Sequence, residues 1–196
     1  MIKIAHRINT ITALRKIPID WGVEVDVRHD NRNGRLYLNH DPGVGEDLER
    51  YLRKFNHAFI IFDIKESGVE DRVIDLASKY RILKSKYFLL DVEFPYLYTA
   101  SRKNIKQIAV RYSKDEPIEM ALKYKNKVDW VWIDTNTKLP LDLKIKNKLK
   151  GFKTCLVSPD RWGRPEDIPK YRMKMKKLGF KLDAVMAGFE HRKSWE

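Results

Sequence analysis

Two carboxylates, Glu24 and Asp26, alternate with the valines Val23, Val25 and Val27. Valine at every second position is typical of a β-strand, in which successive side chains point to opposite faces. The valines therefore share one face, and both carboxylates share the other. Two like charges side by side raise each other's pKa unless a cation lies between them, and hard divalent cations prefer oxygen ligands. The pattern predicts a metal site on this strand.

Short apolar segments alternate with amphipathic segments along the whole chain. Strands are expected at residues 2–6, 22–28, 58–64, 86–91, 106–111, 129–134, 152–158 and 182–187. Helices are expected near residues 9–16, 46–55, 68–80, 94–103, 116–124, 140–150 and 165–178. Eight strands separated by helices predict an α/β fold, a compact (β/α)8 TIM barrel. An open doubly wound sheet is the alternative, but no glycine-rich phosphate loop follows the first strand.

A β-hairpin is expected after the second strand. The turn cluster at residues 30–34 contains Asn33-Gly34, a hairpin signal between two strand-like segments. Residues 35–40 alternate after it. The hairpin would therefore return His40 to the end of the second strand, where Glu24 and Asp26 lie.

Further polar side chains lie at the ends of the expected strands, where (β/α)8 enzymes gather their catalytic groups. They are His6, Arg7, Asp63, Lys65, Asp91, Glu93, Arg111, Asp134 and Ser158. Each signal is weak by itself, because a histidine at a strand end is more often a satisfied surface residue. A structural protein has no reason to collect so many polar strand ends, so the full set favours an active site.

Five motifs match a known pattern in order and spacing. They are His6-Arg7, Asn9-Thr10, Glu24-x-Asp26, His40-Asp41-Pro42 and Asp63-x-Lys65. In these motifs the chain resembles the glycerophosphodiester phosphodiesterase family, which belongs with the phosphatidylinositol phospholipase C-like phosphodiesterases. The resemblance implies a metal-dependent barrel that splits a phosphodiester into an alcohol and a phosphomonoester.

The resemblance also implies a role for each site residue. Glu24, Asp26 and Asp63 would bind one divalent ion, Mg²⁺ or Ca²⁺, since all three donate oxygen. His6 and His40 would be the catalytic acid–base pair. We assign the base to His6 and the acid to His40, an order that the resemblance leaves open. Arg7 and Lys65 would hold the phosphate.

The chain departs from the family pattern in four places. Ile8 stands where glycine usually follows the His-Arg pair, and the loop between Arg7 and Asn9 is shorter. The third metal ligand is Asp63 instead of glutamate. The insertion that usually covers the glycerol site is reduced to residues 43–55. A more open site favours a substrate that is larger than, or different from, a glycerol phosphodiester.

Length and composition predict one domain over residues 1–196, since 196 residues, 43% of them hydrophobic, can bury a sizeable core. The longest apolar runs are far too short to span a bilayer, and the first residues do not resemble a signal peptide. Cys155 is the single cysteine, so no internal disulfide can form. These features favour a cytoplasmic location.

The charge distribution is uneven. The net charge is +13, and residues 138–181 carry 14 Lys or Arg against four Asp or Glu, a net +10. Such a surface attracts anions, and peripheral contact with an anionic membrane is one expectation. No nucleic acid is expected as a partner, because the segment lacks interleaved aromatic residues and no nucleic-acid-binding signature is present. The oligomeric state stays open.

Three functions remain open. The leading hypothesis is a metal-dependent phosphodiesterase that acts on a small-molecule or lipid-derived phosphodiester. The second is a phospholipase-D-like lyase on lysophospholipids, which would form a cyclic phosphate. The third is a catalytically inactive barrel that binds a phosphorylated partner through its basic face. The intact set of His6, Glu24, Asp26 and His40 argues against the third.

Overall fold

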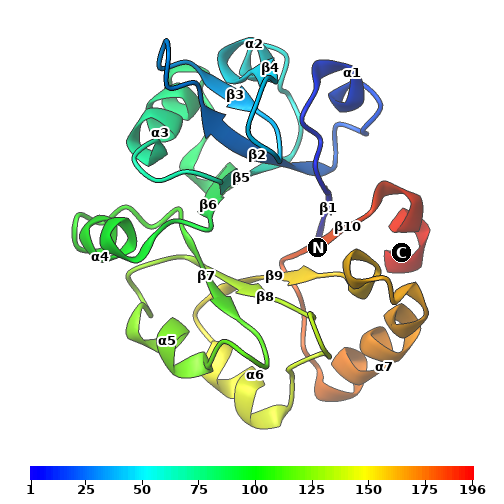
Figure 1. Cartoon of the computed structure of the whole chain (residues 1–196). Coiled ribbons are helices and arrows are strands. Elements are labelled where there is room, and N and C mark those ends of the chain that lie inside the picture. The colour runs from blue at the N-terminus through cyan, green and yellow to red at the C-terminus, as the bar shows by residue number, and fades with distance from the viewer. The chain divides into compact units, whose positions relative to one another are not determined.

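The structure is a computed structural model that describes residues 1–196, apart from the side chain of Arg192. The chain forms two compact units. One unit contains residues 4–99, and the other contains residues 1–3 and 100–196. We call them the N-terminal unit and the C-terminal unit, and strands alternate with helices in each of them (Figure 1).

The N-terminal unit holds the first strands and helices. Its strands are β1 (Ile2–Ala5, which begins in the other unit), β2 (Gly22–His29), β3 (Leu36–Leu38), β4 (Glu46–Asp47), β5 (Phe59–Ile64) and β6 (Tyr87–Leu90). Its helices are α1 (Ile11–Leu14), α2 (Leu48–Leu52), α3 (Glu70–Lys79), the 3-10 turn Lys84–Lys86 and α4 (Phe94–Arg102), which runs past the unit boundary.

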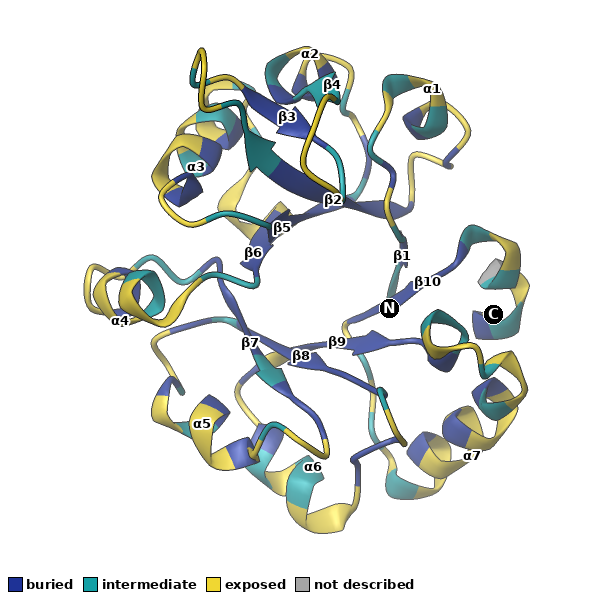
Figure 2. Ribbon diagram, viewed as in Figure 1, coloured by how far each residue is buried: buried dark blue, intermediate teal, exposed yellow. Residues whose placement is uncertain are grey.

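Strand β2 is the centre of the N-terminal sheet. Its residues 22–27 pair in parallel with β5, and its first residues pair in parallel with the end of β1. Strand β6 continues the parallel sheet beyond β5. Val23, Val25 and Val27 are fully buried, as is most of β5 (Figure 2). The strand predicted from the alternating valines is therefore confirmed.

The hairpin after β2 is also confirmed. Strand β3 pairs antiparallel with the end of β2, with Val27 opposite Leu38 and His29 opposite Leu36. Gly34 lies in the turn with a φ of +71°, a backbone conformation that glycine adopts readily. The hairpin uses the same edge of β2 whose first residues pair with β1, and it delivers His40 to the carboxyl end of that strand.

Helices α2 and α3 lie side by side in the N-terminal unit (Figure 1). Glu49 in α2 accepts hydrogen bonds from Lys79 at 2.7 Å and from the hydroxyl of Tyr80 at 2.7 Å. Helix α2 begins after Asp47, whose side chain accepts a hydrogen bond from the backbone of Arg50. Residues 43–55, the shortened insertion, therefore fold as β4 and α2.

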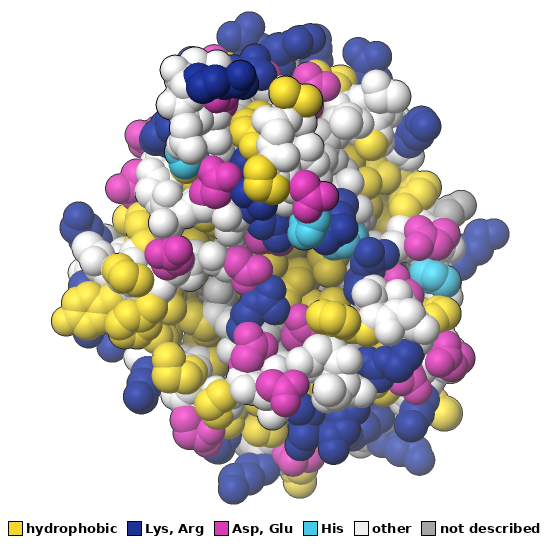
Figure 3. All heavy atoms as spheres, in the orientation of Figure 1, with side chains coloured by type: hydrophobic (Ala, Val, Ile, Leu, Met, Phe, Trp, Pro, Cys, Tyr) yellow, Lys and Arg dark blue, Asp and Glu magenta, His cyan; other side chains and the backbone are white. Residues whose placement is uncertain are grey.

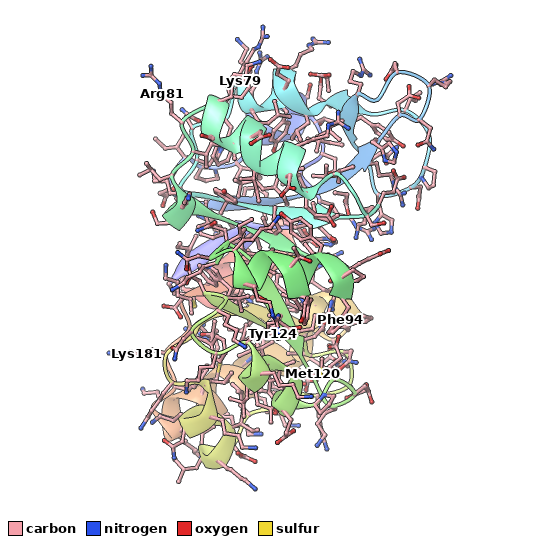
Figure 4. All side chains as sticks on the ribbon, turned by 90° about the vertical axis from the view of Figure 1, so that its left-hand side faces the viewer. Lys79, Arg81, Phe94, Met120, Tyr124 and Lys181 are labelled. Carbon is pink, nitrogen blue, oxygen red and sulfur yellow. The ribbon has the colours of Figure 1, made fainter. Side chains whose placement is uncertain are left out.

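The C-terminal unit repeats the alternation of strands and helices. Its strands are β7 (Ala109–Tyr112), β8 (Trp130–Ile133), β9 (Lys153–Val157) and β10 (Ala184–Ala187), which pair in parallel in this order. Its helices are α5 (Ile118–Lys123), α6 (Leu143–Leu149) and α7 (Ile168–Leu178), with 3-10 turns at Pro159–Trp162, Pro165–Asp167 and Phe189–Trp195. Helix α5 buries Ile118 and Ala121 and exposes Met120, which Figure 4 labels together with Tyr124, the residue that follows the helix.

All eight expected parallel strands and all seven expected helices are present, most of them shortened at their ends. Helix α1 was expected over residues 9–16 and forms only Ile11–Leu14. Thr10 caps this helix by accepting a hydrogen bond from the backbone of Ala13. Asn9 stays outside the helix because both ends of its side-chain amide bind Asp26.

Much of the basic segment 138–181 is engaged in local structure. Lys148 pairs with Glu119 at 2.7 Å, and Lys146 donates to the carbonyl of Leu178 at the end of α7. A cation at that place complements the negative end of the helix dipole. On the face drawn in Figure 3, Lys and Arg side chains are interspersed with Asp and Glu. No helix among the described residues is long and apolar enough to cross a membrane.

Gly45 offers a test of how tightly the returning hairpin is packed. A Cβ atom at Gly45 would lie 2.2 Å from the carbonyl oxygen of Leu38. We therefore expect Gly45→Ala to lower the free energy of unfolding in urea by about 1–3 kcal/mol, as in other overpacked sites. The neighbouring Val44 is 80% exposed, so Val44→Ala should change it by less than about 0.5 kcal/mol. Equal unfolding midpoints for the two variants would contradict this packing.

Candidate active site

Three carboxylates lie together on one face of the paired strands β2 and β5. Glu24, Asp26 and Asp63 each offer an oxygen atom within 4.8 Å of the others. The sheet register brings them together, because Asp26 pairs with Asp63 across the two strands. All three are buried, with exposed fractions of 1%, 1% and 7%. We call this group the acidic triad.

The triad is electrostatically strained. Burial raises the pKa of Glu24 well above its usual value, and the charges of Asp26 and Asp63 raise it further. Burial and the charge of Asp91 raise the pKa of Asp63 to about 6. Buried carboxylates that repel one another in this way are stabilised by a cation placed among them.

The oxygen atoms of the triad fit a hard divalent cation. Glu24 Oε1 and Asp63 Oδ1 are buried, and neither has a hydrogen-bond partner among the described residues. A buried carboxylate oxygen without a partner is costly. All donors in the triad are oxygen atoms, which suits Mg²⁺ or Ca²⁺.

Lys65 supplies a positive charge beside the triad. Its ammonium nitrogen lies 2.6 Å from Asp63 Oδ2 and 3.2 Å from Asp26 Oδ1. Burial alone would lower the pKa of Lys65, but the charge and hydrogen bond of Asp63 outweigh it and raise this pKa. One ammonium group balances part of the charge of three carboxylates, and its contacts leave Glu24 Oε1 and Asp63 Oδ1 without hydrogen bonds.

Asn9 hydrogen-bonds to both the carboxylate and the backbone of Asp26. Its amide nitrogen donates to Asp26 Oδ2 at 2.7 Å, and its amide oxygen accepts from the backbone N–H of Asp26 at 2.8 Å. Burial would raise the pKa of Asp26, but hydrogen bonds from Asn9 and His40 and the charge of Lys65 lower it. Asp26 is therefore the member of the triad whose negative charge the protein itself stabilises best.

Two histidines flank the triad. His6 follows β1, and its Nε2 lies 3.8 Å from Glu24 Oε2. His40 follows β3, and its Nδ1 lies 3.2 Å from Asp26 Oδ1. The side chain of His6 is 17% exposed and that of His40 is 40% exposed, so both rings remain accessible to solvent or substrate.

Arg7 connects the two sides of the site. Its φ of +54° is unusual for a residue with a side chain, and its backbone N–H donates to Glu24 Oε2 at 2.6 Å. Its guanidinium Nη2 lies 2.9 Å from His40 Nε2. A guanidinium can only donate, so His40 Nε2 accepts this bond and its Nδ1–H donates to Asp26.

The structure thus brings together every site residue predicted from the sequence. His6, Arg7, His40 and Lys65 each have an atom within 4 Å of the triad. Two contributors were not predicted. Asn9 was identified only as the opening of the first helix, although an amide two residues after the His-Arg pair was a usable signal. Asp91 was noted only as a polar strand end, and its effect on Asp63 depends on the pairing of β5 with β6.

The polar strand ends of the C-terminal unit bind one another. Arg111 donates to Asp134 Oδ2 at 3.0 Å, and the indole of Trp162 donates to Asp134 Oδ1 at 2.8 Å. Ser158 accepts a hydrogen bond from Trp195. Cys155 is fully buried, and burial raises the pKa of its thiol, so it packs in the core.

A second group of potential metal ligands lies in the C-terminal unit. Oxygen or nitrogen atoms of Asp160, Glu190 and His191 lie within 4.8 Å of one another. Glu190 is exposed, and Asp160 Oδ2 is already bound by the backbone N–H of Gly188 at 2.8 Å. The acidic triad, with its three buried carboxylates, is the better cation site.

The chemistry open to the N-terminal site follows from its groups. Three carboxylates can hold a divalent ion, Arg7 offers a guanidinium for an anion, and two imidazoles can transfer protons at neutral pH. Such a set suits the cleavage of an anionic ester in which one oxygen loses a proton and another gains one.

Solved structures similar to this chain include two crystal structures of bacterial proteins. One is a putative glycerophosphoryl diester phosphodiesterase from Agrobacterium tumefaciens str. C58, with 14% identity and a TM-score of 0.63 over 98% of this chain and 99% of that one. The other is a glycerophosphodiester phosphodiesterase from the same organism, with 13% identity and a TM-score of 0.66 over 95% of this chain and 96% of that one. No protein-family model and no curated protein matches the chain. The fold that this chain shares with these phosphodiesterases is the α/β TIM-barrel type predicted from its sequence.

Proposed function

We propose that this protein is a metal-dependent phosphodiesterase of the glycerophosphodiester type. One observation carries the proposal: two histidines contact a buried acidic triad. His6 lies against Glu24, and His40 lies against Asp26. The fold shared with two phosphodiesterases over almost the whole chain supports it.

The triad would hold one divalent ion, Mg²⁺ or Ca²⁺, through Glu24, Asp26 and Asp63. When bound, such an ion neutralises the charge of a phosphodiester and of the group that leaves it. Arg7 would bind a non-bridging phosphate oxygen through its guanidinium, whose Nη2 already lies beside His40. Lys65 would add a second positive charge on the side of Asp63.

His6 and His40 would move the protons. His6 is cast as the base that removes a proton from the attacking hydroxyl group. His40 is cast as the acid. Its Nδ1–H is committed to Asp26, so it would protonate the leaving oxygen from Nε2, as the imidazolium and with the Arg7 guanidinium turned from Nε2 to the phosphate. Asp26 thus fixes the ring of His40 in one orientation, and Asn9 in turn fixes Asp26.

The substrate would be a small-molecule or lipid-derived phosphodiester. Residues 43–55 form only the two-residue strand β4 and the five-residue helix α2, so no long insertion is available to cover the site. This favours a headgroup larger than, or different from, glycerol. Peripheral contact with an anionic membrane remains a prediction from the charge of residues 138–181.

A product-resolved screen tests the proposal. We expect turnover of at least one member of a panel of glycerophosphodiesters and lysophospholipids when Mg²⁺ or Ca²⁺ is added, and none after chelation. Phosphorus NMR should show a phosphomonoester as the end product. A cyclic phosphate as the end product would instead identify the lyase. The absence of both products with every substrate and metal would contradict an enzymatic role of this kind.

The metal site is tested by Glu24→Gln. A cation that binds only the folded chain stabilises it by about 2.7 kcal/mol at a concentration of 100 times its Kd. Wild-type protein should therefore melt at a higher temperature with Mg²⁺ or Ca²⁺. Glu24→Gln should lose most of this shift, and its metal-free form should be no less stable than wild type, because one buried repulsive charge is removed.

Asp20→Asn is the matched control for this variant. Asp20 is an exposed carboxylate at the opposite end of β2, so its loss should leave the metal-induced shift intact. If Glu24→Gln retains the full shift, the ion binds elsewhere.

The two histidines are tested by His6→Ala and His40→Ala. General acid–base groups contribute about 10²–10⁴-fold to the rate, so each change should lower kcat by that factor while the melting temperature stays close to that of wild type. His191→Ala, in the C-terminal unit, should leave kcat unchanged. Near wild-type turnover in either of the first two variants would reduce that histidine to a structural role.

A further inference from the structure

Arg28 lies in β2, two residues after Asp26, and hydrogen-bonds to the backbone of His40. Its Nε donates to the carbonyl oxygen of His40 at 3.0 Å, and its Nη2 donates to the same oxygen at 2.9 Å. One edge of the guanidinium therefore holds a single carbonyl oxygen with two charge-assisted hydrogen bonds. The side chain of Arg28 is only 14% exposed, so these bonds are shielded from water.

Glu66 holds Arg28 from its other edge. Its Oε1 accepts from Arg28 Nη1 at 2.7 Å, and its Oε2 accepts from the backbone N–H of His29 at 3.2 Å. Burial would raise the pKa of Glu66, but these contacts outweigh it and lower the pKa. The carboxylate is thus charged near neutral pH and fixes the plane of the guanidinium.

His40 needs such support because it lies outside the sheet. Strand β3 ends at Leu38, and the returning backbone makes one further bond to β2, from Asn39 N to the carbonyl of Asp26 at 3.1 Å. The contacts of the imidazole with Asp26 and Arg7 fix the ring but not the main chain that carries it. A main-chain shift of about 1 Å can lower a rate about 10²-fold.

From this geometry we infer that Glu66 and Arg28 hold the main chain of His40 in place, and that this positions the His40 imidazole for proton transfer. Arg28 and Glu66 are positioning residues, since they act through the main chain of His40 and bind no substrate. The inference rests on the proposed function, because it assigns these residues to the step in which His40 takes part. It also gives a role to Glu66, which directly follows the Asp63-x-Lys65 motif and is not one of the predicted site residues.

The first test is a kinetic comparison of Arg28 variants on the substrate found for the wild-type enzyme. Arg28→Ala should lower kcat about 10- to 100-fold and leave KM nearly unchanged. Arg28→Lys should recover part of this loss, because one ammonium can still donate to the His40 carbonyl but cannot grip it with two bonds. Arg35→Ala is the matched control, since Arg35 lies on the same hairpin, is more than half exposed and pairs with Asp47 instead.

The decisive test places each change in a background without the imidazole. If Arg28 acts through His40, Arg28→Ala should have no further effect on kcat in the His40→Ala enzyme. Glu66→Gln keeps the size of the side chain, and it should lower kcat several-fold in wild type and not at all in His40→Ala. This milder change keeps the test valid if Arg28→Ala fails to fold.

Two outcomes would overturn the inference. The first is a loss of kcat by Arg28→Ala or Glu66→Gln that is equal in the presence and in the absence of the His40 ring, which would show a general structural role. The second is a wild-type kcat in either variant. An inactive wild-type enzyme would instead count against the proposed function itself, so the two failures are distinguishable.

Discussion

Mutual repulsion among three buried carboxylates is the constraint on which the rest of the site depends. The pairing of β2 with β5 forces Asp26 and Asp63 together, and alternation along β2 adds Glu24 to the same group. Burial disfavours the charged form of each carboxylate, and the pKa values of Glu24 and Asp63 are raised for this reason. The neighbouring groups are arranged to offset it.

Each neighbour offsets a different part of this charge. Asn9 and Lys65 bind Asp26, and Lys65 also binds Asp63. The backbone N–H of Arg7, at a positive φ, binds Glu24. Two buried oxygen atoms, Glu24 Oε1 and Asp63 Oδ1, have no hydrogen-bond partner among the residues described. A divalent cation at these atoms would complete the arrangement, and the same cation would attract an anionic ester to the two histidines.

The sequence predicted those parts that depend on local periodicity. Alternating valines identified β2, and Asn33-Gly34 identified the turn that returns His40, so the elements carrying the triad and both histidines were found in advance. The contacts that hold those residues could not be predicted, because they depend on register and on main-chain conformation. The predicted start of α1 was wrong, because Thr10 caps the helix and Asn9, just before the cap, binds Asp26. Lys65 was predicted as a phosphate ligand, and its ion pairs with the triad became visible only in the structure.

The central claim is that the acidic triad holds one divalent cation beside the two histidines. Anomalous diffraction from crystals soaked with Mn²⁺ tests it most directly, since it locates the ion without any assumption about substrate. The account predicts a strong peak with carboxylate oxygens of Glu24, Asp26 and Asp63 at about 2.0–2.6 Å, the range of hard-cation ligands. A peak at Asp160, Glu190 and His191 with none at the triad, or no peak at either place at millimolar Mn²⁺, would contradict it.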